Sequence, residues 1–174
     1  MNTYLKLSDI SLRPLYHSDF PNVLKWTKDK AFCHANGWAL DRSEVELRQW
    51  WSNQVDNRDK TFSRKGIEVK GKLIGYIDIA LLDKDIAELG IAIGERMLWG
   101  KGIGPKVVRH AMDIAHKDLG IITFNAETHE KNTRARNMLK KLDFKEIDSD
   151  ESEEQFGPSN GTIMYQLKLE ETTE

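Results

Sequence analysis

Three glycines, each separated from the next by one residue, stand between an apolar run and an amphipathic segment in the middle of the chain. The residues are Trp99-Gly100-Lys101-Gly102-Ile103-Gly104. Because glycine has no Cβ, such a segment permits unusual φ/ψ values and a close approach of the backbone to a ligand. The free N–H groups and the dipole at the start of the following helix favour an anion. The spacing therefore predicts a phosphate-binding turn between a strand and a helix.

Two common phosphate-binding motifs do not fit this turn. A P-loop requires Lys followed by Ser or Thr after its last glycine, whereas this chain has Pro105-Lys106. A dinucleotide fingerprint requires G-x-G-x-x-G, and Pro105 occupies its third glycine position. A nucleotide-triphosphate or dinucleotide site is therefore not expected here.

Glu88 is the one carboxylate between Asp85 and Glu95, within an otherwise apolar stretch. Burial in such a strand would raise the pKa of a carboxyl group toward neutrality, which suits a general base. The alternative is a structural carboxylate at the surface of a sheet. Both interpretations of Glu88 stay open at this point.

Cysteine and histidine usage argues against metal or thiol chemistry. Cys33 is the only cysteine, so no disulfide forms within the chain, and the five histidines show no Cys/His spacing typical of zinc. We expect no metal site. An acyl-cysteine intermediate on Cys33 is disfavoured because no matching base lies near it in the sequence.

Periodicity and capping residues predict helices and strands in alternation. Helices are expected from Ser18 or Asp19 to Asp29, from Ser43 to Val55, and over Gly104–Leu119 and Lys131–Leu142. Strands are expected over residues 10–15, 62–69, 72–82, 86–94, 121–126, 144–148 and 162–169. Residues 31–41 and the acidic run 148–154 are expected to be loops, and Gly75 a bulge. Because only the unit from Ile86 to Ala126 requires a parallel crossover, the order predicts an α+β fold.

Composition is that of one globular domain over residues 1–174, with its core in residues 10–169. The chain carries a net charge of −2 and is 39% hydrophobic and 31% charged. It has no apolar run long enough to span a membrane and no signal peptide, so we expect a cytoplasmic protein without a membrane partner. Residues 94–145 hold 11 Lys and Arg against 6 Asp and Glu, which suggests an anionic ligand. A nucleic-acid binder using the basic helix is the weaker alternative, because the whole chain is acidic.

Two segments resemble the signatures of the GNAT superfamily of N-acetyltransferases. The glycine turn is similar to Arg/Gln-x-x-Gly-x-Gly/Ala, the acetyl-CoA signature, with Trp99 in the first position. A second similarity is Asn132-Thr133-Arg134-Ala135 followed by Leu139-Lys140-Lys141-Leu142-Asp143-Phe144, with Asp143 in place of glycine. Trp-Gly-Lys-Gly and Leu12-Arg13-Pro14-Leu15 with Asp19 resemble the RimJ/RimL-type branch. The resemblance implies a mixed, mostly antiparallel sheet of about seven strands flanked by about four helices.

The same resemblance implies which residues hold acetyl-CoA. The backbone of Ile91, Ala92 and Ile93 would bind the pantetheine arm, and Asn132 would reach it near the thioester. The pyrophosphate would lie on Trp99, Gly100, Lys101, Gly102, Ile103, Gly104 and Pro105. Arg134, together with Lys101, Lys106 and Arg109, would meet the phosphates, although each cation could equally be a solvated surface residue.

The resemblance also implies a reaction, transfer of the acetyl group to a primary amine by direct attack in a ternary complex. Glu88 lies eleven residues before Trp99, the spacing of the general-base glutamate in histone-type members. Many members have a tyrosine as general acid where this chain has Leu139, so a catalytically inactive acyl-CoA-binding module is the alternative. The acceptor is either a protein N-terminus or a small amine such as an aminoglycoside or polyamine. A homodimer is compatible with this interpretation.

Overall fold

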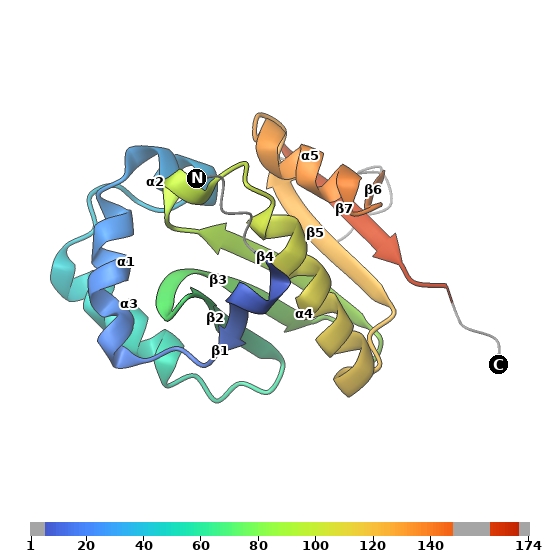
Figure 1. Cartoon of the computed structure of the whole chain (residues 1–174), viewed down its shortest axis with the longest axis horizontal. Helices are drawn as coiled ribbons and strands as arrows, with labels where there is room; N and C mark the ends of the chain where they lie inside the picture. The colour runs from blue at the N-terminus through green and yellow to red at the C-terminus, as the bar shows by residue number, and fades with distance from the viewer. Residues whose placement is uncertain (1–5, 148–160, 171–174) are drawn as a thin grey trace. The chain divides into compact units, whose positions relative to one another are not determined.

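A computed structural model of the chain describes residues 6–147 and 161–170. Its strands form a seven-stranded sheet in the order β1-β2-β3-β4-β5-β7-β6 (Figure 1). The strands are β1 (Ile10–Arg13), β2 (Phe62–Val69), β3 (Lys72–Leu81), β4 (Ile86–Ile93), β5 (Thr123–His129), β6 (Lys145–Ile147) and β7 (Thr162–Lys168). The predicted acidic loop at residues 148–154 lies outside the described residues.

The sheet is mixed and mostly antiparallel, as predicted. β1 pairs antiparallel with β2, and β7 pairs antiparallel with both β5 and β6. β4 and β5 are parallel, with register running from Ile86↔Thr123 to Leu89↔Ala126. The connection between these two strands contains a helix, which is the crossover that the sequence required.

Within the described residues five helices accompany the sheet, one more than predicted. They are α1 (Phe20–Thr27), α2 (Lys30–Asn36), α3 (Glu44–Val55), α4 (Ile103–Leu119) and α5 (Thr133–Lys141), with short 3-10 turns η1 (Leu7–Asp9), η2 (His17–Asp19) and η3 (Arg96–Leu98). The prediction of a loop over residues 31–41 was wrong, because α2 occupies most of it. Asp29 caps α2 by accepting hydrogen bonds from the N–H groups of Ala31 and Phe32, and Gly37 ends it with a φ of 65°. The Asn36-Gly37 pair thus marks a helix end.

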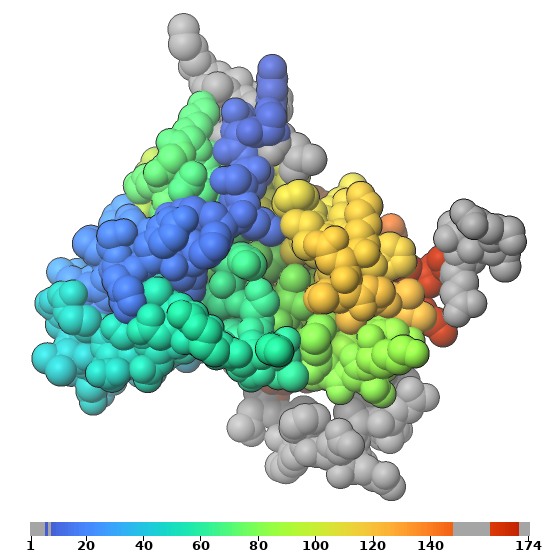
Figure 2. All heavy atoms as spheres, turned by 90° about the horizontal axis from the view of Figure 1, so that it is seen from below, coloured from blue at the N-terminus to red at the C-terminus, as the bar shows by residue number. Residues whose placement is uncertain are grey.

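The chain divides into two compact units, and the division cuts through β3 and β4. The first unit comprises Met1–Asp78 and Ile91–Ile103. Helices α1 and α3 pack together in it, and Figure 2 shows the blue residues of α1 against the cyan residues of α3. The buried cluster of this unit is built mainly from aromatic and aliphatic side chains: Leu15, Phe20, Val23, Trp26, Phe32, Cys33, Leu47, Trp51, Leu73, Tyr76 and Ala92.

The second unit comprises Ile79–Gly90 and Gly104–Glu174. Helix α4 buries an apolar stripe that includes Val107, Ala111 and Ala115, and α5 buries Leu139. Figure 1 shows α5 beside β6 and β7. Among the helices that the structure describes, none is long and apolar enough to cross a membrane.

Candidate functional site: the glycine turn and Glu88

The glycine turn connects the end of β4 to the start of α4. Gly100 and Gly102 have φ values of 72° and 76°, a region in which residues with a Cβ are strained. Both glycines are exposed, and an added Cβ at either would meet nothing within 4 Å. The first N–H groups of a helix have no partner inside the helix. The turn therefore offers backbone donors beside open space, which is what a phosphate group requires.

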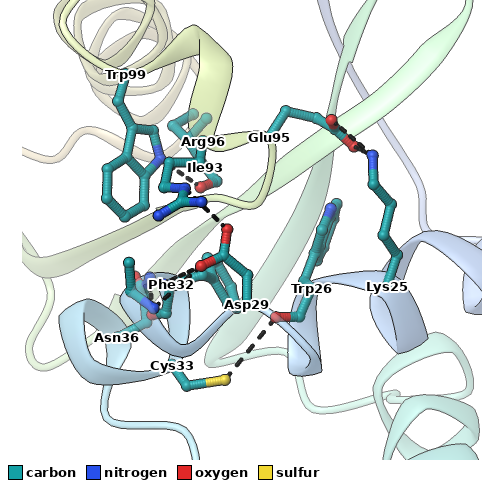
Figure 3. Close-up of polar contacts among 11 residues, drawn as sticks. Lys25, Trp26, Asp29, Phe32, Cys33, Asn36, Ile93, Glu95, Arg96 and Trp99 are labelled. Carbon is teal, nitrogen blue, oxygen red and sulfur yellow. Dashed lines mark hydrogen bonds and ion pairs between the residues drawn. The ribbon is translucent and has the colours of Figure 1, made fainter.

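Trp99 anchors this turn to the end of β4. Its indole Nε1–H donates a hydrogen bond to the Ile93 carbonyl oxygen at 2.8 Å (Figure 3). The ring also packs against the buried cluster of the first unit. The indole therefore positions the backbone of the turn, and replacement of the family's Arg or Gln by Trp99 leaves the backbone donors in place.

The last residues of β4, Ile91–Ile93, lie beyond the described pairing with β5, which ends at Leu89. On the other side, the N–H groups of Gly94 and Glu95 both donate to the Ile74 carbonyl, at 2.7 and 3.3 Å. A Cβ on Gly75 would overlap the Ala92 carbonyl oxygen, so glycine there is required by the close approach of these strands. The end of β4 thus lies close to β3 at Ala92, and the two residues after it are hydrogen-bonded to β3.

Gly104 and Pro105 form the first turn of α4 in the second unit. A Cβ on Gly104 would lie 2.8 Å from the Met138 sulfur of α5. Gly104 therefore permits close packing of the two helices, and Pro105 fits a position where its missing N–H costs no hydrogen bond. Lys101 is exposed in the turn, and Ile103 is buried.

Asn132 and Arg134 lie at the start of α5. The Asn132 Oδ1 accepts a hydrogen bond from the N–H of Ala135 at 3.2 Å, which caps the helix. This cap uses the oxygen of the side chain and leaves its amide NH₂ group out of the contact. Arg134 follows in the first turn with an exposed side chain.

Glu88 is half-buried on β4, in the second unit. Desolvation raises the pKa of its carboxyl group, and the negative charge of Glu127 raises it further. The apolar character of the strand predicts this rise in the pKa of Glu88. Asn125 is the register partner of Glu88 on β5, and its Oδ1 accepts a hydrogen bond from Gln166 Nε2 at 3.0 Å.

Sequence reasoning missed these neighbours of Glu88. Asn125 and Glu127 alternate with buried residues along β5, and this alternation indicates that both side chains lie on the same face of the strand. Their relation to Glu88 depends on a strand register that no local pattern specifies.

Two further positions bear on the chemistry. Leu139 is 4% exposed, an apolar core residue without a hydroxyl group. Cys33 is buried, desolvation raises the pKa of its thiol, and its Sγ lies 3.4 Å from the Thr27 carbonyl oxygen. The thiol is therefore a poor nucleophile. Among the described residues no group of His, Cys, Asp and Glu has the arrangement of a metal site.

Residues 9–145 match the family model of the acetyltransferase (GNAT) domain. A curated relative, the uncharacterized protein MJ1062 of Methanocaldococcus jannaschii, is 30% identical over 103 residues, which are 58% of this chain and 20% of the relative. The match thus spans about a fifth of that relative's length.

Solved structures share the fold at low sequence identity. Spermidine N-acetyltransferase from Vibrio cholerae, in complex with CoA and spermine, has a TM-score of 0.71 and 18% identity over 91% of this chain and 94% of that chain. RimL, a ribosomal L7/L12 alpha-N-protein acetyltransferase in complex with coenzyme A, has a TM-score of 0.74 and 17% identity over 93% and 95% of the two chains.

Proposed function

Because the chain belongs to the acetyltransferase (GNAT) domain family, we propose that it transfers an acetyl group from acetyl-CoA to a primary amine by direct attack in a ternary complex. The expectation of an acetyltransferase is confirmed at the level of the family. The observation that carries the proposal is the turn with positive φ at Gly100 and Gly102, open to solvent before α4.

The cofactor proposal assigns backbone groups to the phosphates. The N–H groups of the turn from Trp99 to Pro105 would hold the pyrophosphate, and the Ile91–Ile93 backbone the pantetheine arm. Asn132, Arg134 and Lys101 remain predicted ligands of the same molecule. When bound, acetyl-CoA supplies the activated acetyl thioester. CoA bound in two structures of the same fold supports this assignment.

The chemical proposal gives Glu88 the role of general base. An amine attacks only in its neutral form, so a proton must leave the acceptor, directly to Glu88 or through a water. A raised pKa makes this carboxylate a better proton acceptor near neutral pH. The backbone N–H of Ala92 or Ile93 would polarise the thioester carbonyl. No general acid is assigned, because a CoA thiolate with a pKa near that of cysteine, about 8.5, can leave unaided.

The acceptor is proposed as one of two classes. The Trp-Gly-Lys-Gly turn and the segment Leu12–Leu15 favour a RimJ/RimL-like enzyme acting on a protein N-terminus. The similarity of the fold to that of RimL supports this acceptor class. The paired carboxylates Glu88 and Glu127 favour a small cationic amine, and spermidine N-acetyltransferase shares the fold. Arg13 itself has a structural role, because it makes two hydrogen bonds to Asp19, at 2.8 and 2.9 Å.

Thiol release from acetyl-CoA tests the proposal. The panel should contain spermidine, an aminoglycoside and peptides with free N-termini, each with the wild type and with Glu88→Gln. We expect turnover with one class and its loss in the variant. Tight CoA binding without turnover on any amine would instead support the inactive acyl-CoA-binding module that Leu139 suggests. Sedimentation of the same preparation tests whether the chain forms a homodimer.

A further inference from the structure

A pocket of about 420 Å³ in the first unit is lined mainly by basic residues. Its walls come from the end of α1, the start of α2 and the residue that opens η3: Lys25, Lys28, Asp29, Lys30, Ala31 and Arg96. Four of these six residues are basic and one is acidic. Since the whole chain carries a net charge of −2, this excess does not follow from a basic composition.

The acidic groups near the pocket are already engaged. Asp29 Oδ1 accepts from the N–H groups of Ala31 and Phe32 at 3.0 and 3.3 Å, and its Oδ2 lies 3.1 Å from Arg96 Nε (Figure 3). The N–H groups at the start of α2 are thus occupied by the protein itself. The side chain of Arg96 is 60% exposed, so this ion pair does not bury its guanidinium group.

Lys25 also has a carboxylate partner, whereas Lys28 and Lys30 have none among the described residues. Lys25 Nζ donates to both oxygens of Glu95 at 3.0 and 2.9 Å. Burial opposes the ionisation of Glu95, but the hydrogen bonds and charge of Lys25 and the charge of Lys72 outweigh it and lower the pKa of this carboxyl. Within residues 6–147 and 161–170, neither Lys28 nor Lys30 has a carboxylate within 4.0 Å. The helix dipole disfavours a lysine in the first turn of a helix, so local stability does not explain Lys30.

We infer that this pocket is a binding site for an oxyanion, a carboxylate or a phosphate, separate from the residues predicted to hold acetyl-CoA. Its binding groups are the ammonium groups of Lys28 and Lys30 and the exposed guanidinium of Arg96. A guanidinium edge matches the geometry of a planar or tetrahedral oxyanion, and two lysines add charge without a fixed geometry. The inference goes beyond the proposed acetyl transfer and does not depend on it.

Titration of the full chain with inorganic phosphate and with succinate, followed by amide NMR at constant ionic strength, tests the site. We expect saturable chemical-shift changes of the amides of residues 28–31 and 96 with at least one of the two anions. The anion that binds more tightly identifies the ligand class. Lys28→Gln/Lys30→Gln should weaken binding about tenfold. The matched control, Lys60→Gln/Lys65→Gln, removes the same charge from two exposed lysines outside the pocket and should leave the affinity unchanged.

Three results would overturn the inference. The same shifts with sodium chloride would show general screening. An equal loss of affinity in both double variants would show a response to net charge alone. Loss of the phosphate shifts at saturating CoA would assign the pocket to the cofactor. The titration needs no turnover, so its result can be interpreted even if the chain does not transfer acetyl groups.

Discussion

Glu88 is a residue at which folding and the proposed reaction favour opposite protonation states. Desolvation and Glu127 raise the pKa of this carboxyl in the folded chain, so the folded state binds more protons than the unfolded state. Stability from this group therefore falls as pH rises through the ordinary glutamate pKa of about 4.3 and up to the raised value. The base role needs the ionised form, which is the form that destabilises the fold.

Replacing Glu88 by Gln should accordingly lower activity and raise stability at neutral pH. We expect kcat/KM to fall by about 10²- to 10⁴-fold, the usual effect of losing a general base. The free energy of unfolding should rise at pH 7.5 by less than about 1 kcal/mol, since solvent screens a half-exposed side chain. At pH 4, where wild-type Glu88 is largely protonated, the gain should vanish. Urea unfolding at the two pH values measures it, and a loss of stability at pH 7.5 would contradict the account.

Glu127 should tune the pH dependence through Glu88. Glu127→Gln removes a like charge, so the pKa of Glu88 falls and the acid limb of the kcat/KM profile moves to lower pH. A carbon NMR titration of the Glu88 carboxyl reports the same shift without requiring turnover. Glu130→Gln, an exposed change in the same unit, serves as the control and should leave both profiles where they are. An unchanged pKa of Glu88 in Glu127→Gln would show that desolvation acts alone.

At the scale of elements, local signals predicted most of the fold. The glycine turn, the start of α3 at Ser43 and the strands β2 and β3 were all predicted from sequence, because each depends on residues close in the chain. Helix α2 was missed because its seven residues are too few for a periodic pattern, and its cap and end residues also occur in loops. The surroundings of Glu88 could be predicted only in part, because they depend on strand pairing: Asn125 is its register partner on β5, and Gln166 on β7 donates to Asn125.

A substitution that adds one methyl group tests the proposed role of the turn before α4 in binding CoA. Gly102→Ala should cost about 1 kcal/mol of stability, because its φ of 76° disfavours a Cβ, and should weaken CoA binding by shifting the backbone donors. Gly120→Ala, at the other end of α4, imposes similar strain at a φ of 71°, again with nothing within 4 Å of the new Cβ. This control should lose stability but keep CoA affinity, as measured by calorimetry. Equal losses of affinity in both variants would show that the turn has no special role.

The pairing of Arg64 on β2 with Asp78 on β3 is a second element-scale feature. Asp78 accepts from Arg64 Nε and NH2 at 2.7 Å each, and the guanidinium lies 4.2 Å from the Tyr76 ring centre. Asp78→Ala would leave a largely buried cation without its carboxylate partner, so the free energy of unfolding should fall by about 2 kcal/mol. Glu44→Ala breaks the exposed pair with Arg48 on α3 and should cost less than about 0.5 kcal/mol. Urea unfolding that shows similar costs for both would contradict the greater burial of the Arg64 pair.

At the scale of the whole molecule, predicted cofactor ligands occur in both compact units, and β4 runs through the boundary between them. A ligand that binds only the folded state stabilises it by mass action. At 100 times its Kd, CoA should raise the free energy of unfolding by about 2.7 kcal/mol. For a chain of this size that corresponds to a rise in Tm of roughly 5–10 °C.

Hydrogen exchange shows where that stabilisation acts. If CoA binds as proposed, amides of residues 91–105 in one stretch and of residues 132–135 in another should both slow, because ordered backbone contacts suppress local opening. Amides of α3, which contribute no predicted ligand, should slow only through the global opening reaction and serve as the internal reference. Protection confined to the stretch 91–105 would remove Asn132 and Arg134 from the ligand set. A rise in Tm without protection in either stretch would mean that CoA binds elsewhere, and the assignment of the glycine turn to its phosphates would be wrong.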